Sequence, residues 1–350
     1  MIKRFGVQCL YFVALLAFLE VVVRVTGAAE RCSDRASKSQ WLVCDPILGF
    51  KVNPNRRPHG QPLNSAGFRS REFTPKVPGM YRILALGDSC TFGAIAAGYV
   101  REPYPQRLER MVAERAGPGR IEVLNAGQGG YNSYHGVMLL RSKLRDLEPD
   151  LITVRYGWND LFMSGVESPR EPGAFGIAVE DMLLRTALYG FVKRLNRELQ
   201  SRRQTVIERR REALAPGKPW RPTNSLPDYR HNLRRIVEIG RARGAEVWLL
   251  TSTNNPRPSP RARAKLRYVN RVSYAELQKI HGAYNDATRR VGTEMGVPVV
   301  DMEAVYREHA GETLFRLDDA PHPTQAGHDL EAEALYALLV ARGILPPSSD

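Results

Sequence analysis

The longest apolar block in the chain lies at its N-terminus. Residues 5–23 are apolar except for Gln8 and Glu20, and two basic residues precede them. As a helix this block would be about 28 Å long, close to the hydrocarbon thickness of a bilayer. Positive charge ahead of such a helix holds that end in the cytoplasm. The pattern predicts a transmembrane signal anchor over residues 5–26, after a cytoplasmic tip at 1–4.

A cleaved signal peptide is the alternative, because small residues at 27–29 suit a cleavage site. Glu20 and Arg24 are one helical turn apart and could pair near the outer boundary, which favours a retained helix. In either case the remainder of the chain is predicted to be periplasmic or extracellular. Cys32 and Cys44 follow the apolar block, and in an oxidising compartment they could form a disulfide.

From residue 81 the pattern changes to short apolar runs that alternate with amphipathic segments. The apolar runs predict strands at 81–87, 121–127, 149–157, 246–252 and 297–302. The amphipathic segments predict helices at 104–117, 133–147, 227–245, 274–296 and 324–343. This alternation predicts a parallel sheet with helices on both faces, within a domain over residues 81–345. Ligand sites of such sheets lie at the carboxyl ends of the strands.

Two segments depart from the alternating pattern. Residues 27–80 are too rich in proline and glycine for long helices, so we expect a loop-rich extension with a short hairpin. The interval at about 163–224 is too long for a simple crossover and predicts a helical insertion. Its apolar residues recur every three or four positions, at Leu184, Leu188, Phe191, Leu195 and Leu199, and its arginines lie at 202, 203, 209, 210 and 211. A lid or acceptor-binding wall and a helical decoration on the sheet edge both fit this pattern.

The composition of the chain is ordinary except for its charge. The chain has 350 residues, of which 43% are hydrophobic and 25% charged, ordinary values for a globular protein. Its formal net charge is +14. No zinc-finger spacing and no basic stretch interleaved with aromatics is found, so we expect no nucleic-acid partner. An arginine-rich solvated surface, or attraction to an anionic membrane, accounts for the charge.

The first candidate for chemistry is the serine that follows the first predicted strand. The stretch RILALGDSCTFG, residues 82–93, breaks at Gly-Asp-Ser and places Ser89 where a helix should begin. A helix N-terminus offers free N–H groups and positive potential, which can stabilise an oxyanion. Serine is also a common helix cap, so Ser89 alone leaves both roles open. The GxSxG elbow of α/β-hydrolases does not occur in the chain.

A serine nucleophile needs a base, and one histidine lies in a tight acidic context. In LDDAPHPTQAGH, Asp319 precedes His322 by three residues, and prolines on both sides of the histidine stiffen the loop. Such a turn can aim the carboxylate at one imidazole nitrogen and leave the other for the serine. Asp318 competes with Asp319 for this role. Thr324 is expected to cap the last helix, and His328 to pack or hydrogen-bond on it.

Oxyanion donors are expected at the ends of the second and third strands. Gly127 lets a backbone N–H approach a substrate, and Asn159 offers a neutral amide donor. A tight turn and a helix cap are the structural alternatives for these two residues. Cys90 follows the serine directly and is expected to be a buried thiol.

These motifs resemble the SGNH, or GDSL-type, hydrolase family in identity and order. Four blocks carry the resemblance: Gly-Asp-Ser at 87–89, Asn-x-Gly at 125–127, Gly-x-Asn-Asp at 157–160 and Asp-x-x-His at 319–322. The resemblance implies a flavodoxin-like sheet, with Ser89 as nucleophile, His322 as base and Asp319 as its orienting carboxylate. It places the Ser89 and Gly127 amides and the Asn159 side chain in the oxyanion hole. Cys90 departs from the family signature, which has leucine there.

The resemblance also implies an activity. We expect a serine esterase that cleaves or transfers a small acyl group through an acyl-enzyme, without metal or organic cofactor. Its substrate would be an ester of a cell-envelope or extracellular glycan or lipid. The segment DPILG…LNSAGFR looks like the extension of membrane-anchored bacterial members. An O-acetyltransferase acting on an extracellular polysaccharide, and a non-catalytic glycan-binding domain, are the alternatives.

Overall fold

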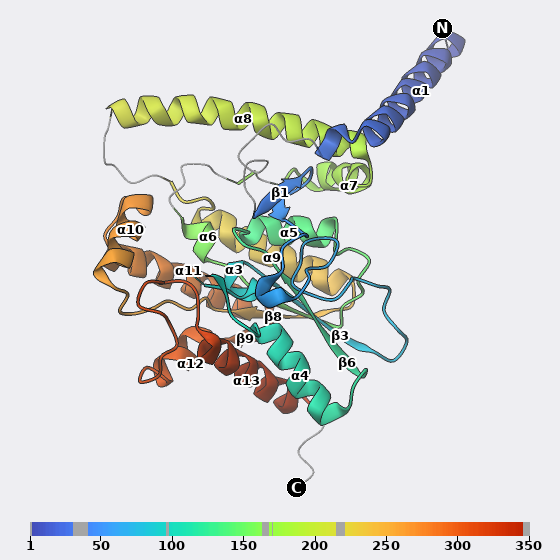
Figure 1. Ribbon diagram of the computed structural model, residues 1–350. Helices are drawn as coiled ribbons and strands as arrows, with labels where there is room; N and C mark the ends of the chain where they lie inside the picture. Colours follow the sequence, from blue (N-terminus) through green and yellow to red (C-terminus); the bar gives the residue numbers. More distant parts are fainter. Residues whose placement is uncertain are drawn as a thin grey trace. The chain divides into compact units, whose positions relative to one another are not determined.

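The computed structural model describes residues 2–30, 41–95, 98–162, 168–169, 171–214 and 221–345. Figure 1 shows the chain coloured from its N-terminus to its C-terminus. The chain forms two compact units. One comprises residues 1–53 and 170–214, and the other comprises residues 54–169 and 215–350.

The larger unit is built on a parallel sheet of five strands. These are β3 (Tyr81–Gly87), β6 (Ile121–Gly127), β7 (Leu151–Arg155), β8 (Glu246–Leu250) and β9 (Val299–Val300). They lie in the order β6-β3-β7-β8-β9, and all four pairings are parallel. Counted along the sheet-forming strands this is 2-1-3-4-5, the flavodoxin-like order, so the predicted fold class is confirmed. The topological switch point lies between the adjacent strands β3 and β7. From β3 the chain continues to β6 on one side of the sheet, and from β7 it continues to β8 on the other side.

Helices cover both faces of this sheet (Figure 1). On one face α4 (Tyr104–Ala116) and α13 (Gln325–Ala341) share a core with the strands. The other face is covered by α5 (Ser133–Arg141), α9 (Leu226–Ala242) and α11 (Tyr274–Met295). Strand residues are buried at nearly every position, which explains their continuous apolar pattern.

Shorter elements complete the larger unit. Its remaining helices are α3 (Ser89–Phe92), α6 (Trp158–Leu161), α10 (Pro260–Asn270), α12 (Met302–Glu308) and the 3₁₀ turn η2 (Pro58–Gly60). The short strands β4 (Ala94–Ile95) and β5 (Gly98–Tyr99) pair antiparallel. The helix predicted at 133–147 is wrong in its second half, because α5 ends at Arg141. The Ser142 hydroxyl donates a hydrogen bond to the Met138 carbonyl at 2.5 Å. A side chain therefore satisfies this carbonyl at the end of the helix, where a continuing helix would use a backbone N–H.

The smaller unit contains the N-terminal helix α1 (Ile2–Thr26), the turn η1 (Ala28–Glu30), and the helices α7 (Ala174–Leu183) and α8 (Ala187–Leu214). It also contains the antiparallel hairpin of β1 (Leu42–Asp45) and β2 (Gly49–Val52). Residues Phe5–Thr26 are long and apolar enough to cross a membrane. Cys44 is disulfide-bonded, and its predicted partner Cys32 lies outside the described residues.

Candidate active site

Ser89 is presented by a sharp turn between β3 and α3. The strand ends at Gly87, and Asp88 caps α3 by accepting a hydrogen bond from the Cys90 N–H at 2.8 Å. The turn needs glycine at 87, because a Cβ there would lie 2.0 Å from the Thr91 Oγ1. Asp88 is the cap, so Ser89 is the first residue of α3. Its own N–H therefore has no acceptor within the helix.

A chain of hydrogen bonds links Ser89 to the loop before α13. Its Oγ lies 2.9 Å from the Nε2 of His322, and the Nδ1 of His322 lies 3.0 Å from both carboxylate oxygens of Asp319. With Nδ1–H donating to the carboxylate, Nε2 is the nitrogen that accepts the serine hydroxyl. Asp319 is buried, while His322 is partly exposed. This arrangement can remove a proton from Ser89 without any further group.

The structure distinguishes Asp319 from its neighbour. Asp318 is exposed and pairs with Arg316, whose Nε lies 3.0 Å from its Oδ1. Asn255 holds the loop in place, because its Nδ2 donates to the carbonyl oxygens of Arg316 at 3.0 Å and Asp319 at 2.9 Å. Thr324 caps α13 as predicted, accepting from the Gly327 N–H.

Cys90 contacts the loop that bears Asp319 and His322, because its thiol donates to the Pro321 carbonyl at 3.2 Å. The residue is buried as predicted. Burial, together with the nearby Asp88 carboxyl, raises the pKa of the Cys90 thiol well above its usual range. The thiolate form is therefore disfavoured, and Cys90 is unsuited to act as a nucleophile.

Asn159 and Gly127 lie at the carboxyl ends of the strands on either side of β3. The Nδ2 of Asn159 donates to the Tyr131 carbonyl at 2.8 Å. An amide nitrogen carries two hydrogens, so one is left for a substrate. The Gly127 N–H donates to the Oδ1 of Asn125 at 2.9 Å, so this single hydrogen is already engaged. Gly127 has a packing role as well, because a Cβ there would lie 2.4 Å from the Phe92 backbone nitrogen.

Asp160, beside Asn159, anchors this part of the site but was not singled out from the sequence. Its buried carboxylate accepts hydrogen bonds from the Ser133 N–H at 3.1 Å and from the Asn224 Nδ2 at 2.6 Å. The Ser133 hydroxyl donates to the same oxygen. Burial raises the pKa of Asp160 to about 7, against the opposing effect of these hydrogen bonds. The network ties α6, which carries Asn159, to the start of α5.

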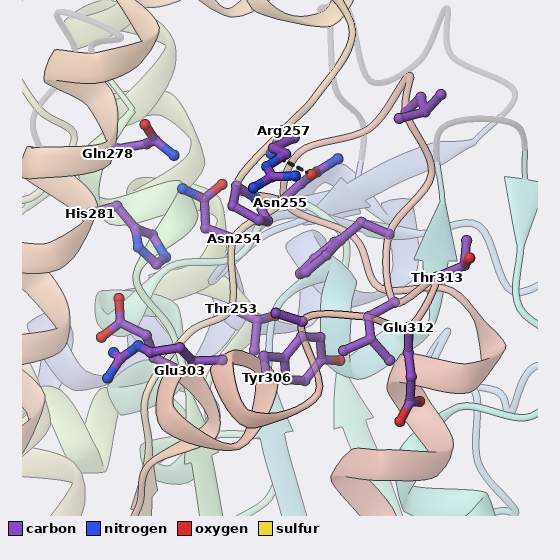
Figure 2. A pocket seen from close by; sticks show the side chains of 16 residues that line it. Thr253, Asn254, Asn255, Arg257, Gln278, His281, Glu303, Tyr306, Glu312 and Thr313 are labelled. Carbon is purple, nitrogen blue, oxygen red and sulfur yellow. Dashed lines mark hydrogen bonds between the residues drawn. The ribbon is translucent and has the colours of Figure 1, made fainter.

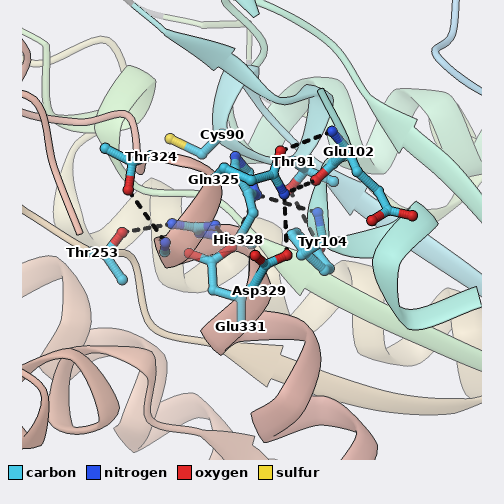
Figure 3. A network of polar contacts seen from close by, with 12 residues as sticks. Cys90, Thr91, Glu102, Tyr104, Thr253, Thr324, Gln325, His328, Asp329 and Glu331 are labelled. Carbon is cyan, nitrogen blue, oxygen red and sulfur yellow. Dashed lines mark hydrogen bonds and ion pairs between the residues drawn. The ribbon is translucent and has the colours of Figure 1, made fainter. Parts of the chain in front are cut away.

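A buried ion pair lies beneath the candidate nucleophile. Arg155, at the end of β7, donates to the Glu331 carboxylate at 2.7 Å and to the Thr253 hydroxyl at 2.7 Å. Figure 3 shows Thr253, Glu331 and His328 gathered in this region. His328 is buried on α13, where its Nδ1 accepts the Tyr104 N–H at 3.2 Å and burial lowers its pKa well below the usual range. The sequence analysis did not predict this pair, although the charged Arg155 at the end of the apolar strand LITVR could have indicated a buried charge that needs a partner.

A cavity of about 580 Å³ opens at the same edge of the sheet. Its walls come from the segment after β8, from α11 and α12, and from the loop that leads to Asp319 (Figure 2). Asn254, Arg257 and Gln278 present polar groups to it, and Phe315 and Leu317 supply apolar surface. Asn255 lines the cavity and also bonds the Asp319 carbonyl, so the cavity adjoins the loop that bears His322.

No cluster of three or more histidine, cysteine or acidic residues suited to a metal ion occurs within the described part of the chain.

Comparison with known sequences identifies the class of protein. The GDSL-like Lipase/Acylhydrolase family model matches residues 85–330, well over half of the chain. The chain belongs to this family and is an ester-cleaving hydrolase.

Individual relatives are more distant. The uncharacterized lipoprotein YqeF of Bacillus subtilis is 23% identical over 226 residues, covering 63% of this chain and 69% of that protein. Among solved structures, a lipase/acylhydrolase from Enterococcus faecalis is 18% identical with a TM-score of 0.48, covering 77% of this chain and 100% of its own. The acetylxylan esterase Axe2 from Geobacillus stearothermophilus is 15% identical with a TM-score of 0.47, covering 75% of this chain and 97% of its own.

Proposed function

We propose that the protein is a serine esterase in which Ser89, His322 and Asp319 form the catalytic triad. The observation that carries the proposal is the continuous hydrogen-bond chain from the Ser89 Oγ through His322 to the buried Asp319. As Oγ attacks the ester carbonyl, its proton passes to the His322 Nε2. The resulting imidazolium is stabilised by Asp319 and returns the proton to the leaving alkoxide. A water molecule then attacks the acyl-enzyme by the same route, releasing the acid and free Ser89.

The oxyanion would be held by the Ser89 N–H and by the free hydrogen of the Asn159 amide. Both donors lie at carboxyl ends of neighbouring strands, where ligands of this fold bind. The Gly127 N–H can contribute only if the Asn125 side chain turns away from it, or if its hydrogen is shared between Asn125 and the oxyanion. One well-placed donor contributes roughly 3–4 kcal/mol to lowering the barrier.

A serine-reactive fluorophosphonate probe tests the assignment. We expect labelling and ester turnover in the wild-type chain, and loss of both in Ser89→Ala with nearly unchanged thermal stability. The neighbouring Cys90→Ala is the matched control and should retain labelling. Turnover that survives Ser89→Ala but is lost on thiol alkylation would instead assign the reaction to Cys90. Absence of labelling and turnover in folded wild-type protein would favour a non-catalytic glycan-binding domain.

The substrate we propose is an acyl ester of a cell-envelope or extracellular glycan or lipid, reached by a membrane-anchored, exported domain. Contacts of α1 support a retained anchor rather than a cleaved signal. The Glu20 carboxylate accepts hydrogen bonds from the backbone N–H groups of Ala187 at 2.9 Å and Leu188 at 2.8 Å. These groups begin α8 and have no acceptor within it, so α1 caps a helix of the folded chain.

Transfer of an O-acetyl group to an extracellular polysaccharide is the second candidate. The observation in its favour is the cavity beside the triad loop, which offers room and polar groups for an alcohol acceptor. Incubating the enzyme with an acetyl ester and an oligosaccharide would distinguish the two reactions. Acetylated sugar as the main product would favour transfer, and free acetate as the sole product would favour hydrolysis.

A further inference from the structure

The helices α7 and α8 expose an unusual amount of apolar surface. Half of the exposed large hydrophobic side chains that the structure describes outside α1 lie on them: Phe175, Met182, Val192, Leu195 and Leu199. Phe175 is 84% exposed, and α7 has no buried residue. Isolated apolar side chains are common on soluble surfaces, but a concentration on two successive helices marks an interaction surface.

On each helix these residues share one face. Val192, Leu195 and Leu199 follow one another at intervals of three and four residues, which places them in one stripe along α8. Phe175 and Met182 are seven residues apart, two turns along the same side of α7. Both helices are therefore amphipathic, with their apolar stripes exposed.

The opposite face of α8 is occupied by its own unit. Arg197 donates to the Ile47 and Pro46 carbonyls, each at 2.6 Å, in the β1–β2 hairpin. Gly190 approaches the same hairpin so closely that a Cβ there would lie 3.1 Å from the Pro46 Cβ. Positions 190 and 197 lie about half a turn around the helix from 192, 195 and 199. The hairpin thus holds α8 with its apolar stripe turned outward.

The start of α8 is attached to α1. Besides capping α8, Glu20 accepts a hydrogen bond from the Arg24 Nε at 2.6 Å, and Arg24 donates to the Arg185 carbonyl at 3.3 Å. Figure 1 shows α1 extending from this junction on the side of α8 away from β1. The apolar stripe of α8 therefore lies on the side toward which α1 extends.

We propose that the exposed faces of α7 and α8 lie in the outer headgroup region of the bilayer that α1 crosses. This inference rests on the proposed membrane anchoring. The occupant is lipid because the surface is continuous with a helix of membrane-spanning length and is fixed to its outer end. The second half of α8 adds five arginines to the sequence, at 202, 203 and 209–211, as is typical of interfacial helices on anionic lipid. The insertion would then add interfacial binding to the anchoring by α1.

Site-directed spin labelling of the full chain tests this. The protein would be reconstituted into vesicles of phosphatidylethanolamine and phosphatidylglycerol, in a Cys9→Ser background that removes the exposed free thiol. A nitroxide at Leu199→Cys should be accessible to oxygen and protected from a water-soluble nickel chelate. The matched control is Gln200→Cys, the exposed neighbour on another face of α8, which should show the reverse.

A third label, at Val13→Cys within α1, separates the two proposals. If Val13 is in lipid while Leu199 and Gln200 are equally accessible to the nickel chelate, the interfacial role is overturned and the anchor stands. If Val13 is accessible to the chelate, the anchor itself fails. Dipolar broadening between Leu199 labels on two chains, with protection from both reagents, would show a second copy on this face and would also overturn the proposal.

Discussion

Asn159 is the residue whose predicted role is easiest to isolate. One of its amide hydrogens is fixed on the Tyr131 carbonyl, and the other is the hydrogen that we propose donates to the oxyanion. Asn159→Ala should lower kcat by roughly 10²–10³ while the fold is kept, because a donor to the developing oxyanion is lost. Turnover of a soluble ester and a thermal melt provide the measurement. A folded variant whose activity falls less than about threefold would show that Asn159 serves only as a structural donor.

Asp160 gives a pH-dependent prediction at the neighbouring position. Burial raises its pKa from 3.8 to about 7 in the folded protein. Between these values the folded state holds a proton that the unfolded state has released, so this group's contribution to stability falls as pH rises from about 4 to about 7. Removing the titration in Asp160→Asn should therefore flatten the pH dependence of the free energy of unfolding over this range.

Urea unfolding at about pH 5 and about pH 8 measures this difference. Asp146→Asn is the matched control, because it makes the same substitution at an exposed side chain. A wild-type pH dependence over this interval equal to that of Asp160→Asn would contradict the assignment, because it would show no proton bound by Asp160 in the folded state alone. It would mean that the hydrogen bonds from Ser133 and Asn224 outweigh burial and keep the carboxylate charged.

Among the packed elements, α3 lies so close to β6 that the strand has room only for glycine at position 127. A Cβ at Gly127 would meet the backbone of α3, 2.4 Å from the Phe92 nitrogen and 2.7 Å from the Thr91 carbonyl carbon. Backbone atoms cannot move aside individually, so Gly127→Ala should displace α3 and Ser89 together. We expect a stability loss of about 1–3 kcal/mol and a large loss of turnover.

Gly129 in the same loop supplies the control for this substitution. A Cβ there meets nothing within 4 Å, so Gly129→Ala should change stability by less than about 0.5 kcal/mol. Differential scanning calorimetry of both variants makes the comparison. Equal stability in the two would show that α3 tolerates a shift and that the glycine serves another purpose.

The strands were predictable from the sequence because they are buried on both faces. The runs at 81–87 and 121–127 coincide with β3 and β6, and the other three strands lie inside the predicted ranges. The helix α10 was not predicted, because only Ala262 and Asn270 are buried in it and no apolar periodicity marks it. Its start was nevertheless visible as Ser259 followed by Pro260, since serine caps the helix and proline suits its first turn.

The candidate site was predictable only where its residues form local motifs. Asp319 and His322 are three residues apart, and Ser89 follows a strand end, so pattern and resemblance sufficed. The partners of Asp160 are different, because Ser133 and Asn224 come from distant segments and no short pattern joins them. The hydrogen bond from the Gly127 N–H to Asn125 depends on a side-chain rotamer, which spacing along the chain does not reveal.

In the whole molecule, the positive net charge and the proposed N-terminal anchor would both favour association with a membrane. The formal charge of +14 gives the chain an attraction to anionic surfaces that is weakened by salt. An apolar helix across the bilayer is insensitive to salt. Retention by charge alone and retention by α1 can therefore be separated in a single fractionation.

The proposed membrane topology can be tested by fractionation, peptide mapping and a fusion reporter. If Phe5–Thr26 spans the bilayer as proposed, the full-length protein should stay with membranes through both high salt and alkaline carbonate, because hydrophobic burial resists both treatments. Mass spectrometry of the mature protein should recover peptides that contain Glu20, since that carboxylate caps α8 in the folded chain. An alkaline phosphatase fused to the C-terminus should be active, as expected for an exported domain behind a cytoplasmic N-terminus.

Glu20→Ala should remain in the membrane but make α8 more susceptible to protease, because two N–H groups lose their acceptor. Extraction by carbonate would refute the anchor, and a mature N-terminus near Glu30 would establish cleavage in its place.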